Sequence, residues 1–121
     1  MMKRNYNHID FLSNHLDSKD SDSVLSLLTE DCLFVAGNNE PITGKEAIKV
    51  ILENFFAAVK STKHEVTDIF ESKNSLVHRG KVTYTRLDNS QLIVPFCDVF
   101  KMKGNLISAY YIYIDWSELF K

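Results

Sequence analysis

The spacing of apolar residues changes near Lys63, and this change constrains the fold more than any other feature of the sequence. Before it, apolar residues recur every three or four positions, as they do on one face of a helix. After it, segments near 64–71, 75–86, 91–102 and 105–115 are rich in Val, Ile, Tyr, Thr and Phe, the composition of strands. Helices grouped ahead of strands with short connections predict an α+β domain, with helices on one face of a curved, mostly antiparallel sheet.

Thr43 and Glu46 mark the clearest helix start, because they fit a capping box. In that motif Thr43 accepts a hydrogen bond from the backbone at Glu46, and the Glu46 side chain reaches back. Apolar positions continue at helical spacing from there to about residue 60. Two shorter helices are expected earlier, one over about 8–17 and one that Asp20 or Ser21 can cap, followed by a short apolar strand.

Length and charge limit the class of protein. The chain has 121 residues, with 14 basic against 16 acidic side chains and a net charge of −2. We expect a single domain over 1–121 that binds no nucleic acid, since such binding needs a basic face. No membrane span is expected, since no apolar run approaches about 20 residues. Cys32 and Cys97 are predicted to be buried, free thiols in a reducing compartment. No apolar stretch follows the first residues as in a secretory signal, so the cytoplasm is expected.

Three stretches of the chain resemble one known family: residues 28–32 after the helical opening, residues 40–48 at the long helix start, and residues 104–107 leading to 113–115. Their order and spacing are similar to the nuclear transport factor 2-like superfamily, in particular its SnoaL-like (polyketide cyclase) and ketosteroid-isomerase-like members. The likeness extends from about residue 8 to residue 119. It implies a cone-shaped sheet wrapped around the long helix, an internal pocket, and a homodimer packed through the convex sheet face.

Enzymes of this family resemble one another in placing carboxylates, His or Tyr inside an apolar cavity, where burial raises the pKa of a carboxyl group. The resemblance therefore implies a small apolar or carbonyl-containing ligand and no cofactor. In this sequence Ala36 stands at the position of the isomerases' aspartate base, and Leu12 stands at that of their oxyanion tyrosine. Because both groups are missing, steroid isomerisation is not expected.

Asp98 is the most unusual polar residue, because it interrupts an apolar run in the third strand segment. A buried carboxylate is costly unless it is paired, protonated or open to water. In the resemblance, Asp98 falls where ketosteroid isomerases have the carboxylic acid that helps to hold an oxyanion. The alternative is a cross-strand ion pair, since a two-residue turn at Asn89 and Ser90 would place Asp98 opposite Lys81, with Arg79 one step further.

Asp115 and His15 are the other candidates for proton transfer. SnoaL-like proteins often end the last strand with an aspartate, which is the acid–base group in some members; the alternative for Asp115 is a polar strand end or a cap of the terminal turn. His15 lies one turn after Leu12, where the superfamily usually has a small residue facing the pocket, and an imidazole titrates near neutrality. His64 stands where SnoaL-like sequences often have His. No pair of histidines has metal-ligand spacing, so no metal site is expected.

The register of the last hairpin decides which residues share a face with Asp98. A two-residue turn at Lys103 and Gly104 places Asp98 with Tyr111, Tyr113 and Asp115, whereas a three-residue loop places it among Tyr110, Ile112 and Ile114. We adopt the two-residue turn, because it collects a mixed polar and aromatic surface suited to a pocket. The expected substrate-binding residues are Leu12, Phe55, Lys81, Thr83, Phe96, Tyr111 and Tyr113, and the expected catalytic residues are Asp98, Asp115 and His15. The other face, expected to form the dimer interface, carries Val82, Tyr84, Cys97, Val99, Tyr110, Ile112 and Ile114.

Two functions remain open. The first is an enzyme, a cofactor-free lyase, isomerase or hydrolase in which Asp98 or Asp115 moves a proton and a tyrosine hydrogen-bonds the developing oxyanion. The second is a non-catalytic dimer that binds a ligand or serves as an interaction module. The pairing of Asp98 separates the two, since an acid locked to Lys81 or Arg79 leaves little free carboxylate for chemistry.

Overall fold

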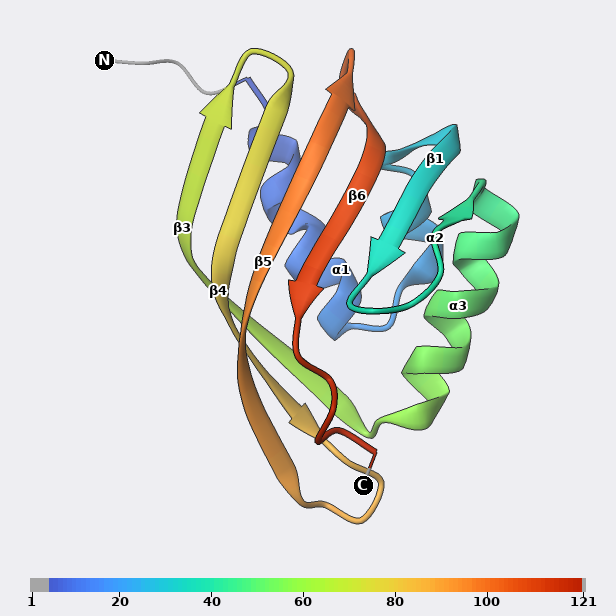
Figure 1. Cartoon of the computed structure of the whole chain (residues 1–121), viewed down its shortest axis with the longest axis vertical. Coiled ribbons are helices and arrows are strands. Elements are labelled where there is room, and N and C mark those ends of the chain that lie inside the picture. The colour runs from blue at the N-terminus through green and yellow to red at the C-terminus, as the bar shows by residue number, and fades with distance from the viewer. Residues whose placement is uncertain (1–4, 121) are drawn as a thin grey trace.

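The computed structural model describes residues 5–120, which form one curved sheet with helices against its concave face (Figure 1). The sheet has six strands in the order β2-β1-β6-β5-β4-β3, and only the β1–β6 pair is parallel. This arrangement confirms the predicted α+β class. The helices are η1 (Asn7–Phe11), α1 (Leu12–Asp17), α2 (Ser21–Leu25) and α3 (Lys45–Ala58). The strands are β1 (Leu28–Ala36), β2 (Ile42–Thr43), β3 (Ser61–Ser72), β4 (Ser75–Thr85), β5 (Gln91–Lys103) and β6 (Leu106–Ile114).

The four long strands lie within a few residues of the segments predicted from composition. Apolar and polar residues alternate in these four strands, because each strand has one face against the core and one face outward. The short apolar strand after the second helix is longer than expected, since it extends over all of β1. Its parallel pairing with β6 joins the first and last long strands of the chain as neighbours inside the sheet.

The capping box predicted at the start of α3 does not form. Gly44 is the N-cap residue, with φ +98°, and no side chain caps the helix. Thr43 is engaged instead in strand β2, where it lies opposite Leu33 of β1. The other end of α3 is closed by Lys19, whose Nζ donates to the carbonyls of Phe56 and Val59 at 2.7 and 2.9 Å. A cation at this end also interacts favourably with the helix dipole.

Both predicted hairpin registers are wrong. Thr85 lies opposite Gln91, so residues 86–90 form the β4–β5 loop, and Asp98 lies opposite His78 rather than Lys81. The loop is long because Asn89 and Arg86 donate backbone hydrogen bonds to the carbonyls of Arg86 and Ser90. In the last hairpin the register shifts after Lys101, and Asp98 lies opposite Ile112. The last turn is Gly104–Asn105 rather than Lys103–Gly104, because Lys103 lies opposite Leu106. Together with the register shift, this gives the grouping of Asp98 that was expected for the three-residue loop.

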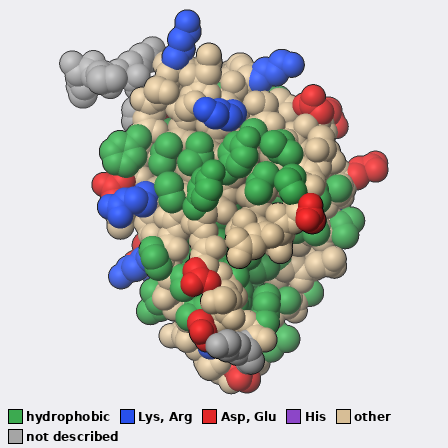
Figure 2. All heavy atoms as spheres, viewed as in Figure 1, with side chains coloured by type: hydrophobic (Ala, Val, Ile, Leu, Met, Phe, Trp, Pro, Cys, Tyr) green, Lys and Arg blue, Asp and Glu red, His purple; other side chains and the backbone are tan. Residues whose placement is uncertain are grey.

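The two faces of the sheet are consequently exchanged for the last strand. Tyr110, Ile112 and Ile114 lie on the concave face with Asp98, whereas Tyr111 and Tyr113 lie on the convex face. The set expected to form a dimer interface is therefore split between the two faces, since Cys97 and Val99 stay opposite the convex tyrosines. Figure 2 views this convex face and shows hydrophobic side chains gathered across it. The most exposed of them are Phe70, Ile93 and Tyr113, at 59%, 59% and 60% of full exposure.

The bend of β3 across β4 depends on Gly80. A Cβ atom at this position would lie 1.9 Å from the carbonyl oxygen of Glu65, a separation that no side chain permits. Gly80 lies opposite Val66, directly before the register shift between Val66 and Asp68 in β3. The absent side chain lets the two backbones approach, and the resulting curvature produces the hollow that the helices only partly fill.

Both cysteines are free thiols, and Cys32 is buried as predicted. Cys97 is only half-buried, because it lies on the convex face of β5, opposite Tyr113. Within the described part of the chain, no helix is long and apolar enough to cross a membrane.

Replacing Gly80 by Ala should destabilise the fold by about 1–3 kcal/mol or more, because the added Cβ overlaps backbone rather than a movable side chain. Urea unfolding monitored by circular dichroism measures the change. Gly104→Asn is the control, since Gly104 has φ +61° and nothing within 4 Å of an added Cβ, and Asn tolerates that conformation. Equal stability of the Gly80→Ala variant and wild type would contradict this role of Gly80.

Candidate functional site

A cavity of about 320 Å³ lies between the concave face of the sheet, helix α3 and the C-terminal segment after β6. Its wall is mainly apolar and aromatic, and none of the lining residues is Lys or Arg. Such a wall suits a small, largely apolar molecule with few polar groups. The lining residues are Leu16, Phe34, Ala36, Asn39, Ile51, Leu52, Asn54, Phe55, Phe56, Ala58, Thr62, His64, Tyr84, Phe96, Asp98, Tyr110, Ile112, Ile114, Trp116 and Phe120.

Burial separates the mouth of the cavity from its interior. Among the lining residues, Asn39, Ile51, Asn54 and Phe120 are exposed, and they come from the loop after β1, from α3 and from the C-terminal segment. The mouth is therefore bordered by these elements, while Asp98 and the other buried lining residues lie inside.

Asp98 faces the cavity without a protein partner. Its side chain is only 6% exposed, and no described residue forms a hydrogen bond or ion pair with it. Burial raises the pKa of this carboxyl group well above its usual range, so the protonated form is favoured. The cross-strand ion pair considered for Asp98 is contradicted, because Arg79 binds Asp68 at 2.6 Å and Lys81 lies 3.6 Å from Glu65 on the convex side.

Two tyrosines of the concave wall lie near Asp98. Burial raises the pKa of Tyr84 and of Tyr110, and the nearby Asp98 carboxyl group adds to both shifts. Both phenols therefore keep their protons and can donate hydrogen bonds. The Tyr84 hydroxyl accepts a hydrogen bond from Trp116 Nε1 at 2.9 Å, which places the indole against the wall of the cavity.

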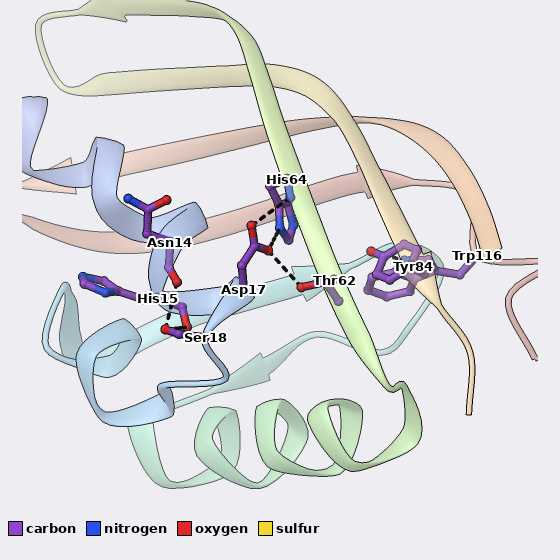
Figure 3. Close-up of polar contacts among 8 residues, drawn as sticks. All are labelled: Asn14, His15, Asp17, Ser18, Thr62, His64, Tyr84 and Trp116. Carbon is purple, nitrogen blue, oxygen red and sulfur yellow. Dashed lines mark hydrogen bonds and ion pairs between the residues drawn. The ribbon is translucent and has the colours of Figure 1, made fainter. Parts of the chain in front are cut away.

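His64 also lines the cavity, and Asp17 at the end of α1 holds it (Figure 3). Asp17 Oδ1 lies 2.6 Å from His64 Nδ1, and Asp17 Oδ2 accepts from the His64 backbone N–H at 2.9 Å. Thr62 donates to Oδ1 at 2.9 Å. Burial acts to raise the pKa of Asp17, but the hydrogen bonds and charge of His64 outweigh it and lower that pKa. The carboxylate thus stays ionised and fixes the imidazole.

The fixed imidazole has one ring nitrogen left for a ligand. When Nδ1–H donates to the Asp17 carboxylate, Nε2 of a neutral His64 is a hydrogen-bond acceptor. No described residue forms a hydrogen bond with Nε2. The ring also packs edge-to-face on Phe96, with centroids 5.4 Å apart, which further limits its rotation. This geometry suits a proton acceptor at the cavity wall.

The structure brings together only part of the predicted site. Asp98, Phe55 and Phe96 line the cavity, whereas the other predicted site residues lie elsewhere. Leu12 is buried in the core, and His15 is half-buried on α1 and points away from the Asp17–His64 pair (Figure 3). Asp115 is exposed and accepts from Ser117 N–H at 2.9 Å, in agreement with the cap considered for it. Lys81, Thr83, Tyr111 and Tyr113 lie on the convex face, because a change of register turns every side chain to the other side.

The sequence analysis did not place Asp17, Tyr84, Tyr110 or Trp116 in the site. Tyr110 could have been found from the three-residue loop considered for the last hairpin, which groups it with Asp98. Tyr84 lies on the same face only because the β4–β5 loop spans residues 86–90. Asp17 had no comparable signal, because its partner His64 is 47 positions away along the chain. Only the packing of α1 against β3 brings them together.

The comparisons with known proteins agree with this fold. The SnoaL-like domain family model matches residues 9–110, and the chain belongs to this family. No curated protein matches the sequence. An NTF2-like protein of unknown function from Burkholderia pseudomallei has a TM-score of 0.88 at 14% identity, with 98% of this chain and 95% of that chain covered.

Two further solved structures carry functional names. A structure from Shewanella putrefaciens that is named as a SnoaL-like polyketide cyclase has a TM-score of 0.82 at 13% identity. The match covers 98% of this chain and 95% of that chain. An LEH-like epoxide hydrolase from M. tuberculosis has a TM-score of 0.79 at 16% identity, covering 95% of this chain and 85% of its own. At these identities the likeness shows a shared fold.

Replacing Asp98 by Asn should make the protein more stable than wild type, increasingly so as the pH rises. A carboxyl group with a raised folded-state pKa stabilises the fold fully below its unfolded pKa, and this contribution is lost as the pH rises through the folded pKa. Between the unfolded and the folded pKa, wild type loses about 1.4 kcal/mol of stability for each pH unit. The Asn variant has no such loss, because Asn does not ionise. Urea unfolding at a series of pH values measures it.

The control for this pH series is Asp115→Asn. Asp115 is exposed, and the hydrogen bond from the Ser117 backbone lowers the pKa of its carboxyl group. This variant should therefore show no gain over wild type as the pH rises. A difference between Asp98→Asn and wild type that stays constant with pH would contradict the protonated, buried state of Asp98.

Proposed function

We propose that this SnoaL-like domain binds a small apolar or carbonyl-containing molecule in the cavity and acts on it as a cofactor-free lyase, isomerase or hydrolase. The observation that carries the proposal is Asp98, a buried carboxyl group that faces the cavity with no partner among the described residues. An unpaired acid that is held protonated in an apolar site can give a proton to a bound molecule near neutral pH. The polyketide cyclase and epoxide hydrolase names of two structural neighbours are consistent with chemistry of this class.

The arrangement of polar groups suggests a division of roles. Asp98 donates a proton or hydrogen bond to the ligand oxygen on which negative charge develops, and the Tyr110 hydroxyl can add a second donor. Tyr110 thus takes the role that was expected of Tyr111 or Tyr113, which lie on the convex face. His64, held by Asp17, accepts a proton from the ligand through Nε2. The cavity wall carries no Lys or Arg, so an anionic ligand would lack a counter-charge from these residues.

A non-catalytic ligand-binding domain is the second candidate. Ala36 lines the cavity at the position where the resemblance to ketosteroid isomerases would place an aspartate base, and Leu12 replaces their tyrosine. A cavity with an acid but no proton acceptor would hydrogen-bond the carbonyl oxygen of a ligand without catalysing its conversion. The role proposed for His64 separates the two candidates, because it supplies the missing acceptor from another strand.

The test begins with the ligand that co-purifies, identified by mass spectrometry of the denatured protein, and continues with assays of that molecule and its analogues. We expect Asp98→Asn to lower kcat/KM by about 10²–10⁴-fold, because the amide cannot transfer the proton. Asp31→Asn is the matched control, since Asp31 is exposed and lies outside the cavity. Full activity of Asp98→Asn on a confirmed substrate would exclude the proposed chemistry. A ligand that binds tightly without any turnover would instead identify a binding domain.

We also propose that the chain forms a homodimer through the convex face of the sheet. The exposed apolar side chains of Phe70, Ile93 and Tyr113 would lose contact with water there. Four charges on this face are already paired within the chain, Arg79 with Asp68 and Lys81 with Glu65, so burying these two pairs would not strand an ion.

Light scattering coupled to size exclusion tests the dimer. Wild type should elute with the mass of two chains, and Ile93→Lys should shift the population toward monomer, because a charge would be buried at the interface. Val50→Lys is the control, since Val50 is equally exposed on α3, away from the sheet face. A wild-type monomer at all concentrations would exclude this interface.

A further inference from the structure

The C-terminal segment, residues 116–120, leaves the end of β6 and runs toward the β4–β5 loop (Figure 1). It belongs to no strand, and its one backbone–backbone hydrogen bond within the described chain is internal, from Leu119 N to Trp116 O at 3.0 Å. Leu119 is fully buried beside Val59, Val82 and Tyr84. The segment is therefore attached to the sheet mainly through side chains.

Arg86, in the β4–β5 loop, makes the main polar attachment of this segment. Its Nε donates to the carbonyl of Leu119 at 2.8 Å, and its Nη2 donates to the carbonyl of Glu118 at 2.9 Å. Nη1 donates to Ser90 Oγ at 3.1 Å, which fixes the plane of the guanidinium group. Hydrogen bonds from a charged, planar donor are stronger than those between neutral groups, and their geometry is specific.

The segment that Arg86 holds is part of the cavity itself. Trp116 and Phe120 are lining residues, and their rings lie 5.3 and 6.3 Å from the ring of Phe55 on α3. Trp116 also donates to Tyr84 on the opposite wall. Phe120 is one of the exposed residues at the mouth, so displacement of the segment would widen the opening between α3 and the sheet.

We infer that residues 116–120 form a strap that narrows the mouth of the cavity, and that Arg86 determines how often the strap opens. Local opening is favoured where a segment lacks ladder hydrogen bonds, and here the bonds to be broken are the two from Arg86 to carbonyls and the one from Trp116 to Tyr84. A ligand that is wider than the existing mouth would enter or leave through this opening. The part of the inference that concerns ligands rests on the proposed function, but the motion of the strap does not.

Trp116 is the single tryptophan of the chain, so its fluorescence reports on the strap directly. Quenching by acrylamide, a small neutral molecule, measures how often the indole is exposed. We expect Arg86→Gln to increase the population of the open strap about tenfold, because Gln cannot make both charged hydrogen bonds, and the quenching constant should rise accordingly. Arg79→Gln is the matched control, since Arg79 binds Asp68 on the convex face. Equal quenching in wild type, Arg86→Gln and the control would overturn the inference.

Hydrogen exchange in the wild-type protein gives a test that does not depend on any variant folding. The amide of Leu119 should exchange faster than the ladder amides of β4, with a rate that changes little at low urea concentrations, because a local opening exposes little surface. If Leu119 exchanges only through global unfolding, the strap does not open on its own and the inference fails. Neither measurement requires a ligand or turnover, so failure of the proposed function would leave this result unaffected.

The effect on ligand traffic is measured with the neutral fluorescent probe N-phenyl-1-naphthylamine. If the cavity takes the probe, Arg86→Gln should raise both its association and its dissociation rates about tenfold, with little change in affinity. Unchanged rates together with increased quenching would show a strap that moves without controlling access, which contradicts the proposed role of Arg86.

Discussion

The close approach of β3 and β4 at Gly80 is the constraint on which the rest of the structure depends. Without a side chain at that position, the two backbones come together and the sheet bends sharply. A bent sheet cannot be covered completely by helices as short as α1 and α2. The space left between the concave face, α3 and the C-terminal segment is the cavity. The site is thus a consequence of curvature, and its chemistry depends on which side chains point inward.

Two carboxyl groups close to this cavity have opposite protonation behaviour, and the cause is their surroundings. Asp98 has an apolar environment and no partner among the described residues, so burial raises its pKa. Asp17 receives hydrogen bonds from His64 and Thr62, which hold its pKa below the usual range despite partial burial. The carboxyl group that faces the cavity therefore keeps its proton, whereas the one behind His64 stays ionised and orients the imidazole. The separation of two pKa values by environment is a common basis for acid–base chemistry near neutral pH.

The candidate site was only partly predictable from the sequence. Asp98 stood out because a carboxylate inside an apolar strand demands an explanation, and it does face the cavity. The tyrosines were assigned to the wrong face, since the alternation of side chains is equally regular in either register. His64 and Asp17 form a pair only through the contact of α1 with β3, and no local pattern in either segment encodes that contact.

The local spacing of apolar residues was sufficient to predict the main helix α3 and the long strands. In each of these elements the spacing follows from the burial of one face against the core. The hairpin registers were decided by tertiary structure. Backbone hydrogen bonds within residues 86–90 stabilise a five-residue loop between β4 and β5. In the last hairpin, the register shift after Lys101 changes which residues of β5 and β6 lie opposite each other. Each such choice turns every following side chain inward or outward, so it also decided which aromatic and acidic groups meet in the cavity.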